Sequence, residues 1–184
     1  MHWLEQRPDD AMAGAFDAIA PQPLVTIDAA AFRNAMSRLG AAVHVITTAG
    51  AAGRGGLTAT AICSVSDAPP TLLVCLNRRS QAAPVLQQNG AFCVNTLAAA
   101  DAAIADLFAG RTGVPREERF ALGEWTTLAT GCPVLASAVV AFDCRTIDVK
   151  AVGSHNVIFG VVEAVRLGQD EASLVYHNRG YKQV

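Results

Sequence analysis

The sequence is poor in charge and has no long apolar run. Charged residues make up 16% of its 184 residues and hydrophobic residues 52%, and the formal net charge is −2. A disordered chain needs low hydropathy and high net charge, so this composition excludes one. Neutralising phosphates requires clustered lysine and arginine, so we expect no binding to nucleic acid. No apolar stretch reaches the roughly 20 residues that span a bilayer, so we expect no membrane association.

Cysteine spacing of the kind that binds zinc is also absent. The five cysteines are Cys63, Cys75, Cys93, Cys132 and Cys144, an odd number with no C-x-x-C pair. This argues against a disulfide framework and against a metal site. The first residues lack a basic segment followed by an apolar one, so no secretory signal is expected. Free cysteines within apolar stretches fit a reducing compartment, and we predict a cytoplasmic protein.

Standard cofactor and catalytic motifs are missing as well. The glycine-rich stretch 53–56 does not match G-x-G-x-x-G at the start of a helix, and no Walker A motif occurs. There is no G-x-S-x-G nucleophile elbow and no histidine pair with metal-ligand spacing. Any chemistry must therefore rest on less familiar local features.

The chain is predicted to contain one domain behind an N-terminal extension. Residues 1–27 are rich in Ala, Asp and Pro and are predicted to be partly flexible, with a short helix near residues 9–19. Residues 28–184 have the length of a single domain, because domains cluster at roughly 100–200 residues.

Within that domain the apolar pattern changes from a helical period to a strand period. Asp28 can cap a helix, and Gly40 can end it. Phe32, Met36 and Leu39 share one face of this helix at spacing i, i+4, i+7. Strands are predicted at 43–47, 57–65, 71–76, 91–97, 138–149, 156–167 and 173–176, helices at 81–89 and 100–110, and a polar connection at 111–132.

This order of elements predicts a mostly β fold with peripheral helices. The strands do not alternate with long helices, which argues against a doubly wound parallel sheet. A closed antiparallel barrel with helices on its outside fits best, because closure removes edge strands.

The first of three segments suited to a ligand is 57–66, LTATAICSVS. Small and hydroxylated residues fill a strand that would otherwise be bulky. Small side chains let a flat ligand lie against the backbone, and hydroxyls with strand-end N–H groups can bond its polar edge. A Thr- and Ser-rich strand that faces water is the other interpretation.

The second segment, Asn77-Arg78-Arg79-Ser80, lies between a buried strand and a helix start. A helix N-terminus offers unpaired N–H groups and a positive dipole end, so with a hydroxyl and an arginine it suits a phosphate. An ordinary cap with two solvated arginines is the alternative.

The third segment, Gly153-Ser154-His155, immediately precedes a strand. A histidine preceded by glycine at a strand entry can present its ring face to a planar ligand, and a surface loop histidine is the alternative. His44 lies on an alternating strand and is interpreted as structural.

In this order, the three segments resemble the short flavin reductases with an FMN-binding split-barrel fold. These are the small reductase components of two-component flavin monooxygenases. The resemblance extends over about residues 30–181. Besides the three segments it is carried by FRNAMSRLG at 32–40, PPTLLVCLN at 69–77, CVNTL at 93–97, FAG at 108–110 and ERF at 118–120. Within the family it looks closest to the reductases of aromatic hydroxylases and to the pyrimidine-utilisation flavin reductase.

The resemblance implies an antiparallel split β-barrel and an NAD(P)H:flavin oxidoreductase activity. Such an enzyme reduces FMN or FAD by hydride transfer from NADH, with NADPH as the alternative, and supplies the reduced flavin to a monooxygenase. It also implies a homodimer whose flavin lies in a groove near the subunit interface. The hydride chemistry belongs to the two bound molecules, so the protein needs only to align them.

The resemblance also implies particular site residues. The isoalloxazine edge and ribityl chain would be held by Thr58, Ala59, Thr60, Ala61, Cys63, Ser64, Val65 and Ser66. The phosphate would be held by Asn77 and Ser80 with Arg78 or Arg79, while Asn95 and Phe108 would line the pocket. Gly153 and His155 occupy the family's Gly-Asp-His motif, which is associated with nicotinamide binding, and this chain has Ser154 in place of the Asp.

Two other functions share this fold. A non-catalytic flavin- or haem-binding protein would bind its ligand tightly and show no NADH turnover. An oxidase of the pyridoxamine-phosphate type would need a second basic cluster for the substrate phosphate, and none stands out in the sequence.

Overall fold

The computed structural model describes residues 26–184, so the helix predicted near residues 9–19 lies outside the described residues. The chain divides into two compact units, Met1–Ala35 and Met36–Val184. Helix α1, Ala29–Met36, begins directly after Asp28. The Asp28 carboxylate accepts the N–H groups of Ala30 and Ala31 at 2.7 and 3.0 Å, so the predicted cap is confirmed.

The predicted extent of this first helix was too long. The helix ends at Met36, and Leu39 lies beyond it in a bend before Gly40. The i, i+4, i+7 spacing identified the helix correctly, but it did not locate its last turn.

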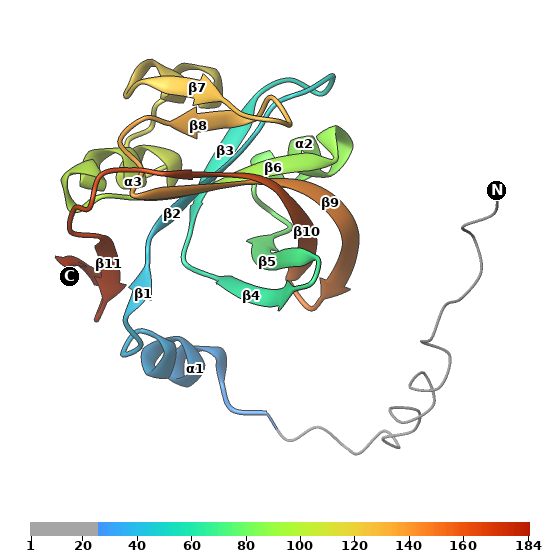
Figure 1. Ribbon diagram of the computed structural model, residues 1–184. Helices are drawn as coiled ribbons and strands as arrows, with labels where there is room; N and C mark the ends of the chain where they lie inside the picture. The colour runs from blue at the N-terminus through green and yellow to red at the C-terminus, as the bar shows by residue number, and fades with distance from the viewer. Residues whose placement is uncertain (1–25) are drawn as a thin grey trace. The chain divides into compact units, whose positions relative to one another are not determined.

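Residues 36–184 fold around a seven-stranded antiparallel sheet (Figure 1). In the sheet the strands follow the order β3-β2-β6-β9-β10-β5-β4, and each neighbouring pair is antiparallel. Their bounds are β2 His44–Thr48, β3 Gly55–Ala59, β4 Ile62–Asp67, β5 Pro70–Asn77, β6 Ala91–Thr96, β9 Val140–Val152 and β10 His155–Leu167. The prediction of a mostly β, antiparallel fold is confirmed.

Two small sheets and several short helices complete this unit. One sheet pairs β1 Ala41–Ala42, β11 Leu174–His177 and β12 Gly180–Gln183, and the other pairs β7 Trp125–Thr127 with β8 Pro133–Leu135. The helices are α2 Ala82–Asn89, α3 Ala102–Phe108 and the 3-10 turns η1 Ala99–Asp101 and η2 Arg116–Ala121. The sequence pattern missed β7, β8 and β12, because strands this short show almost no alternation. No helix within residues 26–184 is long and apolar enough to cross a membrane.

The strand predicted over 57–65 is in fact two strands. It breaks at Thr60 and Ala61, which carry the chain from β3 at one edge of the sheet to β4 at the other. The carbonyl of Ala61 accepts the N–H of Cys75 at 2.9 Å, so the crossing is anchored on β5. Within residues 26–184 no ladder joins β3 to β4. The closed barrel predicted from the order of elements was therefore wrong, whereas an antiparallel split barrel, which the resemblance implied, agrees with this open edge.

The alternation of β5 shows how the sheet builds its core. Leu72, Val74 and Leu76 are buried, whereas Leu73 and Cys75 between them are half-buried. The three buried side chains belong to a cluster with Ile46, Leu86, Phe92, Val94, Cys144 and Ile158. One face of β5 therefore packs inward while the other remains partly open, which brings Cys75 to the surface of the cleft described below.

His44 is buried in β2, and its Nδ1 lies 3.0 Å from the hydroxyl of Thr96 on the neighbouring strand. Burial lowers its pKa from 6.5 to about 4. His44 is thus neutral in the folded chain, in agreement with its interpretation as structural.

The depressed pKa of His44 predicts acid destabilisation. As the pH falls from about 6.5 towards 4, the unfolded chain binds a proton that the folded chain does not, so the unfolding free energy decreases, at most by roughly 3 kcal/mol. The His44→Gln variant should show a weaker decrease between pH 7 and pH 4.5 in denaturant titrations. The exposed His177→Gln change is the matched control and should keep the wild-type dependence. An identical pH dependence in the His44 variant would contradict this assignment.

Candidate active site

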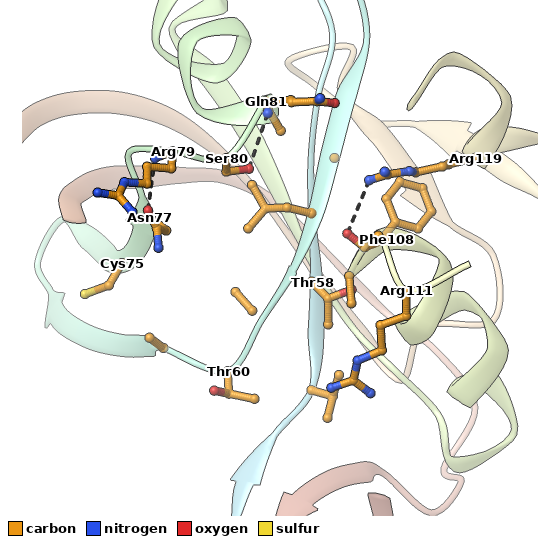
Figure 2. Close-up of a pocket in the computed structure, with 18 of the residues that line it drawn as sticks. Thr58, Thr60, Cys75, Asn77, Arg79, Ser80, Gln81, Phe108, Arg111 and Arg119 are labelled. Atoms are coloured by element: carbon orange, nitrogen blue, oxygen red, sulfur yellow. Dashed lines mark hydrogen bonds between the residues drawn. The ribbon is translucent and has the colours of Figure 1, made fainter. Parts of the chain in front are cut away.

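A cleft of about 680 Å³ opens beside the crossing from β3 to β4 (Figure 2). Its walls come from β3, the end of β5, the start of α2, the end of α3, η2 and the β11–β12 hairpin. Nine predicted site residues line it, namely Thr58, Ala59, Thr60, Ala61, Asn77, Arg79, Ser80, Phe108 and His155. Three segments chosen separately from the sequence therefore meet in one cavity.

The first wall is the end of β3 and its continuation. Thr58 donates its hydroxyl proton to the carbonyl of Ala105 at 2.6 Å, which ties this strand to α3. Figure 2 shows Thr58 and Thr60 between two groups of residues, with Asn77 and Ser80 on one side and Phe108 on the other. The small side chains of Ala59 and Ala61 alternate with these threonines and leave the backbone accessible, so a flat molecule can approach it.

The second wall is the turn from β5 into α2. Asn77 Oδ1 accepts the Arg79 N–H at 2.9 Å, and the Ser80 N–H donates to the Asn77 carbonyl at 2.9 Å. Gln81 directly precedes the helix and makes no side-chain capping bond, while Ser80 Oγ accepts the Ala82 N–H at 3.3 Å. The Ser80 hydroxyl therefore keeps its proton available for an acceptor in the cleft.

His155 reaches the cleft from the first residue of β10, opposite Asn77 in the sheet. Its Nδ1 lies 2.9 Å from the hydroxyl of Ser154, the residue that stands where the family motif has Asp. The Arg78 N–H donates to the Ser154 carbonyl at 3.0 Å, and its guanidinium donates to the carbonyl of Gly153. Arg78 and Gly153 thus shape the turn that carries His155 and do not line the cleft, so Arg79 is the arginine of the predicted pair that does.

The second half of the segment 58–66 lies elsewhere. Cys63, Ser64 and Ser66 line a separate cavity of about 660 Å³, to which Thr60 also contributes. In the part of the chain that the structure describes, Val65 is 48% exposed and lines neither of these two cavities. The break at residues 60–61 divides the segment, which the prediction of one continuous strand did not anticipate.

Asn95 is a core residue, and its prediction as a pocket-lining residue was wrong. It is fully buried on β6. Its Nδ2 donates to the carbonyl of Val45 at 3.1 Å and to Thr47 Oγ1 at 3.2 Å, and its Oδ1 accepts the Leu135 N–H at 2.8 Å. The amide satisfies backbone groups of β2 and β8, so its role is to join these two strands to β6.

The structure adds cleft residues that the sequence did not reveal. They include Cys75, Gln81, Arg111, Arg116, Arg119, Tyr176 and Tyr181. The three arginines come from the polar connection predicted at 111–132, where no period distinguishes them from solvated residues. With Arg79 they give the cleft four arginines, and none of the described residues that line it is acidic. These arginines form one basic group around the cleft, which favours an anionic ligand.

Arg111 is held by a network at one side of the cleft. Its Nη1 donates to Asp106 Oδ1 at 2.8 Å and to the Tyr181 hydroxyl at 3.4 Å. Tyr181 in turn donates to Asp106 Oδ1 at 3.0 Å. Burial and this bond raise the pKa of Tyr181 to about 12, so the hydroxyl keeps the proton that it donates. The network ties the β11–β12 hairpin to the end of α3.

The cleft is built for binding more than for acid–base chemistry. His155 is its one histidine among the described lining residues, and no carboxylate lies beside it there. Within residues 26–184 no group of three or more His, Cys, Asp or Glu side chains could hold a metal ion. Small residues, a hydroxyl and arginines around an open cleft suit a flat molecule that carries phosphate.

A protein-family model described as a flavin reductase like domain matches residues 36–184. The chain belongs to the flavin reductase-like family. The resemblance inferred from the sequence is confirmed, and the matched residues coincide with the unit that contains the cleft.

Relatives of this flavin reductase-like chain are close. It is 56% identical over 158 residues to FMN reductase (NADH) RutF 1 of Methylorubrum extorquens strain PA1, a match that covers 86% of this chain and 77% of the relative. It is 49% identical over 172 residues to FMN reductase (NADH) RutF of Acinetobacter baylyi, covering 94% and 90% of the two chains.

Solved structures confirm the fold. BorF, the flavin reductase component of a bacterial two-component tryptophan halogenase, superposes with a TM-score of 0.79 at 29% identity, over 85% of this chain and 98% of BorF. The flavin reductase PheA2 superposes with a TM-score of 0.78 at 27% identity, over 86% and 99% of the two chains. The predicted fold type of the family is therefore correct.

One contact fixes the shape of the cleft and can be tested. A Cβ on Gly56 would lie 2.6 Å from Cε1 of Phe108, whereas a Cβ on Gly55 would meet nothing closer than 3.5 Å. The Gly56→Ala change should therefore displace the Phe108 ring and destabilise the fold by about 1–3 kcal/mol.

Gly55→Ala, one residue earlier on the same strand, is the matched control and should be nearly neutral. Thermal and denaturant unfolding would measure both variants. Equal stabilities of the two variants would show that Phe108 is free to move aside.

Proposed function

We propose that the protein is an NADH-dependent flavin reductase that reduces FMN, with FAD as an alternative flavin and NADPH as an alternative reductant. The observation that carries this proposal is the meeting of β3, the Asn77–Ser80 turn and His155 around one arginine-rich cleft. Family membership and the name of the relative with 56% identity, FMN reductase (NADH), support it.

The residues of the cleft fit a flavin mononucleotide. Thr58, Ala59, Thr60 and Ala61 offer a low wall with hydroxyls and backbone groups for the ring edge and ribityl chain. Ser80 and an arginine of the cleft would hold the phosphate where α2 begins, because a helix N-terminus favours negative charge. Each part of such a ligand therefore has a complementary group among the described residues.

Hydride transfer from nicotinamide to flavin is chemistry that the two bound molecules supply. The protein has to hold the two rings in reacting geometry and exclude unproductive orientations. His155 would position the nicotinamide, with its ring orientation set by the hydroxyl of Ser154. The residues at the cleft do no proton transfer in this scheme, which agrees with the absence of carboxylates among its described lining residues.

We further propose that the reduced flavin leaves for a separate monooxygenase. The reductase BorF, which shares the fold, is a component of a two-component system. A cytoplasmic location is proposed with it, because the five cysteines are free thiols, as expected of a reducing compartment.

A homodimer is the proposed assembly. Large apolar side chains remain exposed on the long strands β9 and β10, with Ile147 59%, Val152 60%, Val165 51% and Leu167 79% exposed. Exposed apolar side chains favour association, because burying them removes them from water.

Steady-state kinetics test the proposed activity. NADH and NADPH crossed with riboflavin, FMN and FAD should show nicotinamide oxidation only when flavin is present. His155→Ala should raise the KM for NADH about tenfold, equivalent to about 1.4 kcal/mol, and change the KM for flavin much less.

His177→Ala, in the β11–β12 hairpin, is the control variant and should leave both constants unchanged. Flavin binding without any NADH turnover would instead support the non-catalytic alternative. Equal effects of His155→Ala on both KM values would assign that residue a structural role.

Sedimentation velocity tests the assembly. The wild-type chain should sediment as a dimer, and Ile147→Asp together with Val165→Asp should shift it to the monomer, because two charges would be buried at the contact. Leu122→Asp is the control, since Leu122 is 45% exposed but lies outside these strands. A monomeric wild-type chain would refute the proposed dimer.

A further inference from the structure

The arginines of the cleft differ in what they already bind. Arg111 pairs with Asp106 at 2.8 Å and also donates to the Tyr181 hydroxyl at 3.4 Å. Arg119 donates to the carbonyls of Val114 and Phe108 at 3.3 and 3.5 Å, so its guanidinium holds α3 and η2 together. These two residues therefore have structural partners that account for their positions.

Arg116 is placed differently, against the turn that begins α2. Its Nη1 donates to the carbonyl of Gln81 at 3.3 Å, and Gln81 directly follows Ser80. Both Ser80 and Arg116 line the cleft. The guanidinium therefore stands at the same end of the cleft as the Ser80 hydroxyl, although the two residues lie far apart in the sequence.

The charge of Arg116 is weakly compensated. Its carboxylate partner is the adjacent Glu117, at 3.2 Å and with 71% of its side chain exposed, and such exposed pairs contribute little. Its Nε is buried and has no acceptor among the described residues. A guanidinium with an unused donor and an exposed counter-ion is held in place without being neutralised.

Arg79 does not place a second positive charge beside the Ser80 hydroxyl. In Figure 2 its guanidinium points away from Ser80 and Gln81. Among the described residues, Arg116 of η2 contacts the start of α2 directly, through the carbonyl of Gln81, the residue after Ser80.

We infer that Arg116 is the specificity-determining cation for the flavin phosphate. This inference rests on the proposed function and names a residue of that same site. Arg116 and the Ser80 hydroxyl together favour a flavin that carries a phosphate over riboflavin, which lacks one.

The test compares flavins in the Arg116→Gln and Arg116→Lys variants. Arg116→Gln should raise the KM and the Kd for FMN about tenfold or more, because a charge-assisted contact is lost, and should change those for riboflavin less than about twofold. Arg116→Lys should lie between, since it keeps the charge but loses the planar guanidinium. Flavin fluorescence measures the Kd without turnover.

Arg145→Gln is the matched control. Arg145 pairs with Glu163 at 2.5 Å on the sheet and does not line the cleft among the described residues. This variant should leave the KM and the Kd for both flavins unchanged. Thermal unfolding of each variant checks that the fold is retained. If Arg116→Gln does not fold, the Arg116→Lys variant provides the same comparison of FMN with riboflavin.

The possible failures are distinguishable. Equal losses of affinity for FMN and riboflavin in both Arg116 variants would overturn the inference, because the loss of a merely structural residue would weaken the binding of both flavins alike. A wild-type protein that oxidises no NADH with any flavin would overturn the proposed function, while the FMN and riboflavin Kd values would still decide the role of Arg116.

Discussion

The crossing of the chain at Thr60 and Ala61 is the constraint on which the cleft depends. A continuous strand there would have placed Thr58 and Ser64 on one ladder. Instead the chain leaves one edge of the sheet and joins the other, with the Ala61 carbonyl bonded to Cys75. The two edge strands remain unpaired with each other in the described chain, and the cavity lies beside this opening. The fold therefore provides a ligand site by leaving a barrel incomplete.

Charge in the cleft comes from segments that are distant in the sequence. Arg79 precedes α2, Arg111 follows α3, and Arg116 and Arg119 belong to η2. A carboxylate holds Arg111, and backbone carbonyls hold the two arginines of η2. The cleft is thus positive without a basic run in the sequence, and the overall charge of −2 gives no sign of it.

The sequence was informative where side-chain patterns are local. Asp28 capped its helix, and the strand over 71–76 and the position of Asn77–Ser80 between that strand and a helix could be predicted directly. Asn95 was misplaced because a mid-strand amide looks alike whether it faces a ligand or satisfies backbone groups in the core. Arg116 could not be found, because its role depends on a contact with Gln81 that only the tertiary fold creates. The break at Thr60 was missed for the same reason, since it is set by pairing with β5.

Arg78 connects two parts of the cleft that serve different ligands in the proposed reaction. Its backbone N–H donates to the Ser154 carbonyl, and its guanidinium donates to the Gly153 carbonyl. Two hydrogen bonds therefore connect the turn before α2 to the turn before His155. A displacement of one turn would therefore strain the hydrogen bonds that join it to the other. If two bound molecules are coupled through these turns, thermodynamic reciprocity makes each of them change the affinity for the other by the same factor.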